Sequence, residues 1–179
     1  MKKFLIVLVV LFVLVGCTDI TNTPSKKVSE YIGMYQTMDS KILEQLDAWI
    51  NKDQAMNEKQ KKEYKSLMEK QYQHLSYKIK DEKTKDDTAT VDTEIQVYDY
   101  RSSIKASEEY LKEHKKEFYG KDKKVDNSKF IDYKLKKLKD VTEREHYTIE
   151  FNLKKVNKRW QIIDVTDKDI EKIHGLYKD

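Results

Sequence analysis

The chain has 179 residues, a formal net charge of +4 and 38% charged residues. This length suits one domain, and the small charge excess does not indicate a nucleic-acid partner. Cys17 is the only cysteine, which excludes an intramolecular disulfide and any metal site built from several cysteines.

The first 17 residues have the pattern of a secretion signal. Lys2 and Lys3 precede an uninterrupted apolar run over residues 4–15, and Gly16 and Cys17 follow. A basic start, a short apolar run and a small residue before the cleavage point are typical of such signals. The run is too short for a membrane-spanning helix, which needs about 20 apolar residues.

The sequence Leu14-Val15-Gly16-Cys17 resembles the lipobox of bacterial lipoproteins. The resemblance implies a diacylglycerol on the Cys17 sulfur and cleavage between Gly16 and Cys17. We therefore expect a signal peptide over residues 1–16, a lipidated tether over residues 17–25 and one domain over residues 26–179. Two acyl chains would hold this domain stably on the outer face of the cytoplasmic membrane. An ordinary signal peptide with a chance cysteine is the alternative.

Apolar residues at helical spacing predict three helices after the tether. Asp39 or Ser40 would cap the second of them, and residues 51–55 would separate it from the third. The three stripes are Val28, Tyr31, Ile32, Tyr35 and Met38; Ile42, Leu43, Leu46, Trp49 and Ile50; and Tyr64, Leu67, Met68, Gln71 and Tyr72.

The pattern then changes to alternation, which predicts a hairpin of strands over residues 75–80 and 89–97 around a polar turn at residues 81–87. Helical spacing returns over residues 102–118, where Gly120 would end the helix, and over residues 131–138, where Ser128 would cap it. A second hairpin follows, with strands over residues 147–153 and 159–165 and a tight turn at Asn157-Lys158. Asp167 would cap a last helix over residues 168–174, ended by Gly175.

This order of elements resembles the NTF2-like, cystatin-like lipoproteins. The matching segments are residues 23–31, 88–97 and 147–162. The resemblance implies an α+β fold in which N-terminal helices pack on a curved antiparallel four-stranded sheet to form a cone. Helical crossovers and a short C-terminal helix would be additions to it.

Enzymes of that superfamily use inward-pointing Asp, His or Tyr side chains as general acid and base, so the resemblance makes Asp99 and His114 candidates. Asp99 continues the inward row of the second predicted strand and could act as a base. Alternatively, Asp99 caps the following helix. His114 lies on an apolar stripe and could face the same pocket, or it could be a packed, hydrogen-bonded histidine. We expect no metal, because the histidines lack ligand spacing. We also expect no cofactor, and the chain has no phosphate-cradling glycine loop.

Tyr98, Tyr100 and Arg101 form a possible binding surface. Both tyrosines point outward by strand alternation, and exposed aromatic side chains beside a cation are common at binding surfaces. Alternatively, the neighbouring helix covers them.

These observations favour a non-enzymatic, membrane-anchored binding module of the cell envelope, which would bind an envelope protein or a small apolar ligand. Two alternatives are a pocket enzyme with Asp99 as its base and an assembly subunit of an envelope transfer or secretion machine.

Overall fold

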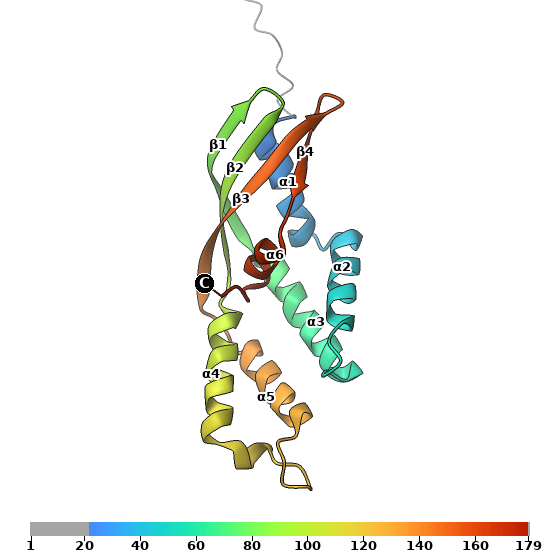
Figure 1. Cartoon of the computed structure of the whole chain (residues 1–179), viewed down its shortest axis with the longest axis vertical. Coiled ribbons are helices and arrows are strands. Elements are labelled where there is room, and N and C mark those ends of the chain that lie inside the picture. The colour runs from blue at the N-terminus through green and yellow to red at the C-terminus, as the bar shows by residue number, and fades with distance from the viewer. Residues whose placement is uncertain (1–21, 179) are drawn as a thin grey trace, which may run out of the picture.

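The computed structural model describes residues 22–178 and has an α+β fold, as expected (Figure 1). The elements in chain order are α1 (Pro24–Gln36), α2 (Ser40–Asn51), α3 (Glu58–Gln73), β1 (Ser76–Lys85), β2 (Thr88–Tyr98), α4 (Tyr100–Glu113), the 3-10 helix η1 (Lys115–Phe118), α5 (Asn127–Lys139), β3 (Arg144–Val156), β4 (Arg159–Asp164) and α6 (Asp167–His174). The predicted signal peptide and Cys17 lie outside the described residues.

The four strands form one antiparallel sheet in the order β1-β2-β3-β4, which is curved and not closed. In the central pair, Val91 lies opposite Phe151 and Thr93 opposite Ile149. All four side chains are buried, because alternation places them on the face that the helices cover. The predicted inner row of β2 is therefore confirmed, and the expected four-stranded sheet with it.

Helices α1, α3 and α6 contact the sheet or each other in the middle of the molecule (Figure 1). Their buried stripes include Val28 and Ile32 of α1, Met68 and Tyr72 of α3, and Ile173 of α6. Together with the inner face of the sheet they make one continuous core. Burial of these apolar side chains is the main favourable contribution to folding. The single cysteine allows no intramolecular disulfide to add to it.

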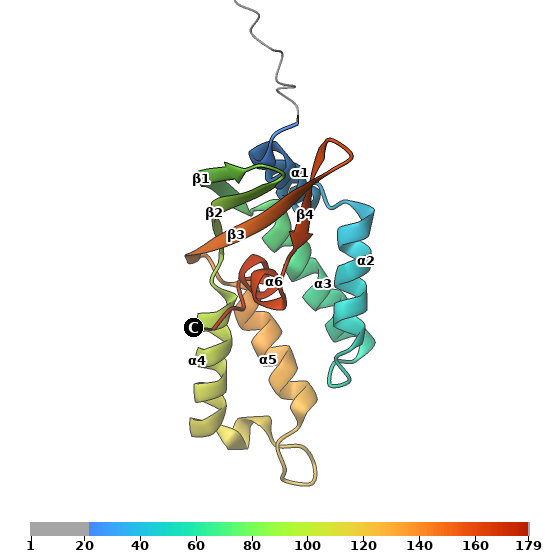
Figure 2. The same cartoon turned by 45° about the horizontal axis from the view of Figure 1, so that its top comes forward.

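The molecule is elongated, and its two ends are built differently (Figures 1 and 2). The start of α1 and the turns of both strand hairpins lie at one end. Helices α4 and α5, inserted between β2 and β3, pack against each other and extend to the opposite end. Long-range contacts between α3 and α5 connect this helical pair to the rest of the domain.

Several element boundaries differ from the predictions. Strand β1 continues to Lys85, because the turn uses only Asp86 and Asp87, with Asp86 at a positive φ of 52°. Asp126 caps α5 instead of Ser128, and Thr166 caps α6 instead of Asp167. The predicted helix over residues 102–118 is split, because α4 ends at Glu113 and η1 follows.

The fold begins before the predicted domain boundary at residue 26. Pro24 is the first residue of α1, and the Thr23 side chain caps the helix by accepting from the Lys26 amide. The Asn22 side chain donates to the Lys158 carbonyl at 2.6 Å and accepts from the Trp160 amide at 3.3 Å. Residues 22–25 therefore belong to the folded domain, next to the turn between β3 and β4.

Candidate functional site

Asp99 is the N-cap of α4. Its carboxylate accepts a hydrogen bond from the Ser102 amide at 2.9 Å, and its own amide donates to the Glu143 carbonyl at 3.0 Å. The strand ends at Tyr98, so the alternation of β2 does not extend to Asp99, and its predicted place in the inward row is wrong. The alternative, a helix cap, is the observed one.

His114 lies at the other end of α4 from Asp99, where it is the C-cap. Its ring stacks on Tyr110 with centroids 4.0 Å apart, and its Nδ1 lies 3.2 Å from the Tyr110 carbonyl oxygen. His114 is thus half-buried in packing within the α4–α5 pair. Asp99 and His114 therefore lie at opposite ends of α4 and do not converge on a common pocket.

Tyr100 is fully buried, with 0% of its side chain exposed, and its hydroxyl donates to the Leu67 carbonyl at 3.2 Å. Tyr98 is half-buried, and its ring centroid lies 4.5 Å from the Arg144 guanidinium and 5.0 Å from the Lys70 ammonium. The expectation that both tyrosines are exposed is wrong, because Tyr100 already belongs to α4 and packs on α3. A buried Tyr100 side chain is not available to a binding partner, so Tyr100 is not part of a binding surface.

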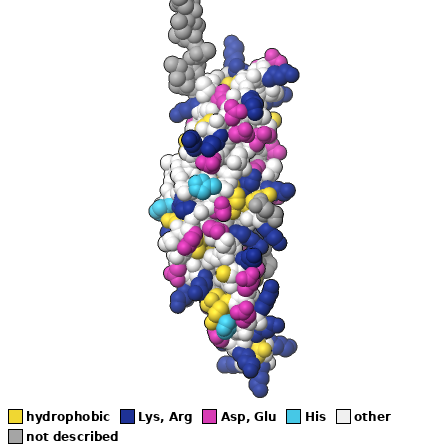
Figure 3. All heavy atoms as spheres, turned by 90° about the vertical axis from the view of Figure 1, so that its left-hand side faces the viewer, with side chains coloured by type: hydrophobic (Ala, Val, Ile, Leu, Met, Phe, Trp, Pro, Cys, Tyr) yellow, Lys and Arg dark blue, Asp and Glu magenta, His cyan; other side chains and the backbone are white. Residues whose placement is uncertain are grey.

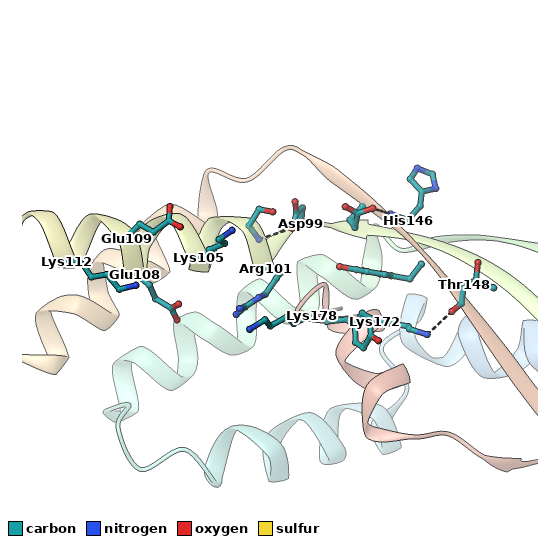
Figure 4. Close-up of a pocket in the computed structure, with 14 residues that line it drawn as sticks. Asp99, Arg101, Lys105, Glu108, Glu109, Lys112, His146, Thr148, Lys172 and Lys178 are labelled. Carbon is teal, nitrogen blue, oxygen red and sulfur yellow. Dashed lines mark hydrogen bonds between the residues drawn. The ribbon is translucent and has the colours of Figure 1, made fainter.

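Arg101 and Asp99 line an open groove of about 830 Å³ between α4, β3 and the C-terminal segment (Figure 4). Its lining includes both cations such as Lys105 and carboxylates such as Glu108 and Glu145, so we call it the mixed-charge groove. Lys172 also lines the groove, and its ammonium group donates a hydrogen bond to the Thr148 carbonyl oxygen at 2.8 Å. Because both signs line this wide groove, it does not favour a ligand of either charge.

A second hollow differs in character. It is a cleft of about 390 Å³ between α1, α2, α3 and α6, which we call the tyrosine cleft. Its walls are mostly apolar or aromatic, and the Trp49 side chain, 40% exposed, lies at its margin. The lining residues are Tyr31, Tyr35, Ile42, Gln45, Leu46, Ala48, Trp49, Lys52, Tyr72, Val165, Ile170 and His174.

Two pairs of polar groups meet in this cleft. The Tyr31 and Tyr35 hydroxyls lie 3.1 Å apart, and the Tyr72 hydroxyl lies 2.7 Å from His174 Nε2. The Tyr35 and Tyr72 rings join the pairs by an edge-to-face contact with centroids 5.0 Å apart. Four hydrogen-bonding side chains from three helices therefore converge on one apolar hollow.

Burial sets the protonation of these groups. It lowers the pKa of His174 to about 4, so the imidazole is neutral at physiological pH. Burial also raises the pKa values of Tyr31, Tyr35 and Tyr72, so their hydroxyls remain protonated. The cleft thus offers neutral donors and acceptors and no buried charge.

A close contact at Gly175 fixes the position of His174. Gly175 ends α6 at a positive φ of 69°, and a Cβ there would lie 2.1 Å from the Tyr98 carbonyl oxygen. The Gln71 side chain binds both the amide and the carbonyl of Tyr98, at 2.8 and 3.1 Å. Only glycine fits this contact between α6, α3 and the end of β2, and the contact holds His174 against Tyr72.

The tyrosine cleft has the properties of a small-molecule site, since such sites are concave, largely apolar and contain a few placed polar groups. The mixed-charge groove lacks this combination of apolar walls and a few polar groups, because charged side chains make up much of its lining. The helical spacing of the sequence predicts buried faces for Tyr31, Tyr35 and Tyr72, but it does not predict their proximity to His174. The available signal was the buried stripe of the last helix, Ile170, Ile173 and His174, but no local pattern showed where that helix packs.

Within residues 22–178, no group of three His, Cys, Asp or Glu side chains is arranged to hold a metal ion. Within the same residues, no helix combines the length and the hydropathy needed to cross a bilayer.

Comparisons of the chain with protein-family models, curated proteins and solved structures found no match. The fold and the tyrosine cleft are therefore the structural observations on which a function can be based.

Proposed function

We propose that this protein is a membrane-anchored lipoprotein of the cell envelope whose tyrosine cleft binds a small, largely apolar ligand without transforming it. The anchor in this proposal is a diacylglycerol on Cys17, at the outer face of the cytoplasmic membrane. The support for the anchor is the sequence of residues 1–17. The support for ligand binding is the convergence of Tyr31, Tyr35, Tyr72 and His174 on the cleft.

The ligand is expected to carry an apolar, preferably aromatic, body and one neutral hydrogen-bonding group. Trp49 and the tyrosine rings offer aromatic faces and edges for such a body. The hydroxyls and the neutral imidazole can donate to or accept from one polar group. A charged group is not favoured inside the cleft, because no opposite charge is buried there to compensate for its desolvation.

Binding without catalysis is favoured over an enzyme with Asp99 as its base. The Asp99 carboxylate already accepts a hydrogen bond from the first turn of α4, and it lines the mixed-charge groove instead of the tyrosine cleft. The candidate base and the apolar pocket are thus at different places.

The neutral fluorescent probe N-phenyl-1-naphthylamine tests the cleft, because it is apolar and aromatic with one N–H group and its emission rises in apolar sites. Ala48 lines the cleft and is exposed, so Ala48→Phe should narrow the opening without disturbing the core. We expect a loss of probe affinity of about tenfold, or about 1.4 kcal/mol. In a Trp160→Phe background, the probe should also quench the remaining Trp49.

Ala106→Phe on the exposed face of α4 is the matched control and should leave probe affinity unchanged. If the two variants weaken binding equally, or neither does, the cleft is not the binding site.

A further inference from the structure

The helical pair is strongly basic from the end of α4 to the end of α5. Residues 112–139, which we call the basic arm, contain eleven lysines and five acidic residues, a net charge of +6. The rest of residues 22–179 contains 23 basic and 26 acidic residues, a net charge of −3. The nearly neutral balance of the whole chain therefore conceals two regions of opposite sign.

Four of the five acidic side chains in the arm accept hydrogen bonds from N–H or O–H groups of other residues in the protein. Asp126 caps α5, Asp122 accepts from the Lys124 amide, and Glu117 accepts from the Tyr110 hydroxyl. Asp132 accepts from the buried Gln60 side chain of α3 at 2.8 Å. These carboxylates support the fold of the arm, so they are poorly placed to pair with its lysines.

The lysines of η1 and of the loop that follows it have no acidic partner within the described residues. Lys115, Lys116, Lys121, Lys123 and Lys124 are all exposed, and none makes an ion pair with another residue of the described chain. In Figure 3, Lys and Arg side chains gather at the lower end of the molecule, where the arm lies.

A cluster of aromatic side chains packs α4, η1 and α5 together beneath these lysines. Tyr110 stacks on Tyr133 with centroids 5.0 Å apart, and Phe118 meets Phe130 and Tyr133 edge to face at 5.5 and 5.3 Å. The lysines are thus presented by a folded element, which reduces the conformational entropy lost on binding.

The arm lacks the apolar surface of a typical protein interface. Within residues 22–178, the large hydrophobic side chains that are clearly exposed are Trp49, Val156 and Ile163, and all three lie outside the arm. The arm also lies at the opposite end of the long axis from the start of α1, so a tether through the N-terminus directs it away from the proposed anchoring membrane (Figure 1). An acidic polymer fits this surface better than a protein or the lipid headgroups of that membrane.

We infer that the basic arm binds a linear, phosphate-bearing polymer of the cell envelope. The ammonium groups of several exposed lysines neutralise successive phosphates along such a chain and release its counterions, so binding weakens steeply with salt. The assignment to an envelope polymer rests on the proposed outer-face location, whereas the affinity for phosphate polymers rests on the arm alone.

Inorganic polyphosphate is the test probe, with the full-length protein held in zwitterionic detergent. The quadruple variant Lys116→Gln/Lys121→Gln/Lys123→Gln/Lys124→Gln should bind polyphosphate about tenfold or more weakly at low salt. The slope of log K against log salt concentration should become shallower by about 3, as expected for four lost phosphate contacts.

The matched control is Lys41→Gln/Lys78→Gln/Lys85→Gln/Lys168→Gln, which removes the same charge from exposed lysines elsewhere. It should retain most of the affinity. Equal weakening in both variants, or none in the arm variant, would overturn the inference. Neither Cys17 nor the tyrosine cleft is needed for this measurement, so failure of the proposed function would not affect it.

Cell-wall fragments test the source of the polymer. Fragments that retain their phosphodiester-linked polymers should retain the wild-type protein and lose the arm variant, and acid removal of the polymers should abolish binding. Binding that survives this removal, or equally strong arm-dependent binding to phosphatidylglycerol vesicles, would show that the envelope polymer is not the partner.

Discussion

At the scale of single residues, His174 combines burial with a hydrogen bond to Tyr72 at the centre of the tyrosine cleft. Its low pKa has a simple physical cause: the imidazolium form would lose most of its hydration and would gain no negative partner. The cleft therefore keeps a neutral histidine, which is what an apolar ligand with one hydrogen-bonding group requires.

The same residue makes the stability of the fold depend on pH. The pKa of His174 is about 4 in the folded protein, against about 6.5 in the unfolded chain. Between these values the unfolded chain binds the extra proton, so stability is complete above pH 6.5 and falls as the pH drops towards 4.

Between pH 7 and pH 5, wild type should lose about 2 kcal/mol more unfolding free energy than His174→Gln does. Urea unfolding of both proteins at the two pH values measures the difference. An equal loss in both proteins would mean that His174 is not the buried neutral group described above.

At the scale of elements, side-chain periodicity is a reliable guide to the helices and strands that bury one face, such as α1 and β2. The spacing of Val28, Ile32 and Tyr35 predicts α1, and the alternation of Val91, Thr93 and Ile95 predicts β2. Element ends depend on single hydrogen bonds, and several residues near each end can make them. Asp126 and Ser128 are both good caps by type, and only the structure distinguishes them.

The candidate site was less predictable, because it depends on contacts between distant segments. Tyr72 and His174 are 102 positions apart, and no local pattern indicates that α6 packs beside α3. Tyr100 shows the reverse error. Strand alternation places it outside, but the chain leaves the strand at Asp99 and buries the Tyr100 side chain against α3.

Asp99 provides the test at this scale, because a cap and a catalytic base respond differently to substitution. Asp99→Ala should cost about 1 kcal/mol of stability, whereas Asp99→Asn should cost only a few tenths, since Asn caps helices as well as Asp does. Chemical denaturation of both variants measures this. If Asn destabilises as much as Ala, the bond to the Ser102 amide is not the main role of Asp99.

At the scale of the whole molecule, the start of α1, the tyrosine cleft and the basic arm occupy successive positions along the long axis (Figure 1). Asn22 is fixed beside the turn between β3 and β4, at the end opposite the arm (Figure 1). The five residues from Cys17 to Thr21 can span at most about 18 Å when extended. A lipid on Cys17 would therefore hold the sheet end close to the membrane and direct the basic arm outward.

The most direct test of the proposed lipid anchor is mass spectrometry of the protein extracted from the membranes of cells that produce it, beside a Cys17→Ala variant. The proposed lipid anchor predicts a mature chain that begins at Cys17 and carries a diacylglycerol on the Cys17 sulfur, and a Cys17→Ala variant that is no longer retained with membranes. A wild-type chain that is unacylated at Cys17, or a Cys17→Ala variant that fractionates like wild type, would contradict the proposal of a lipid-anchored binding protein.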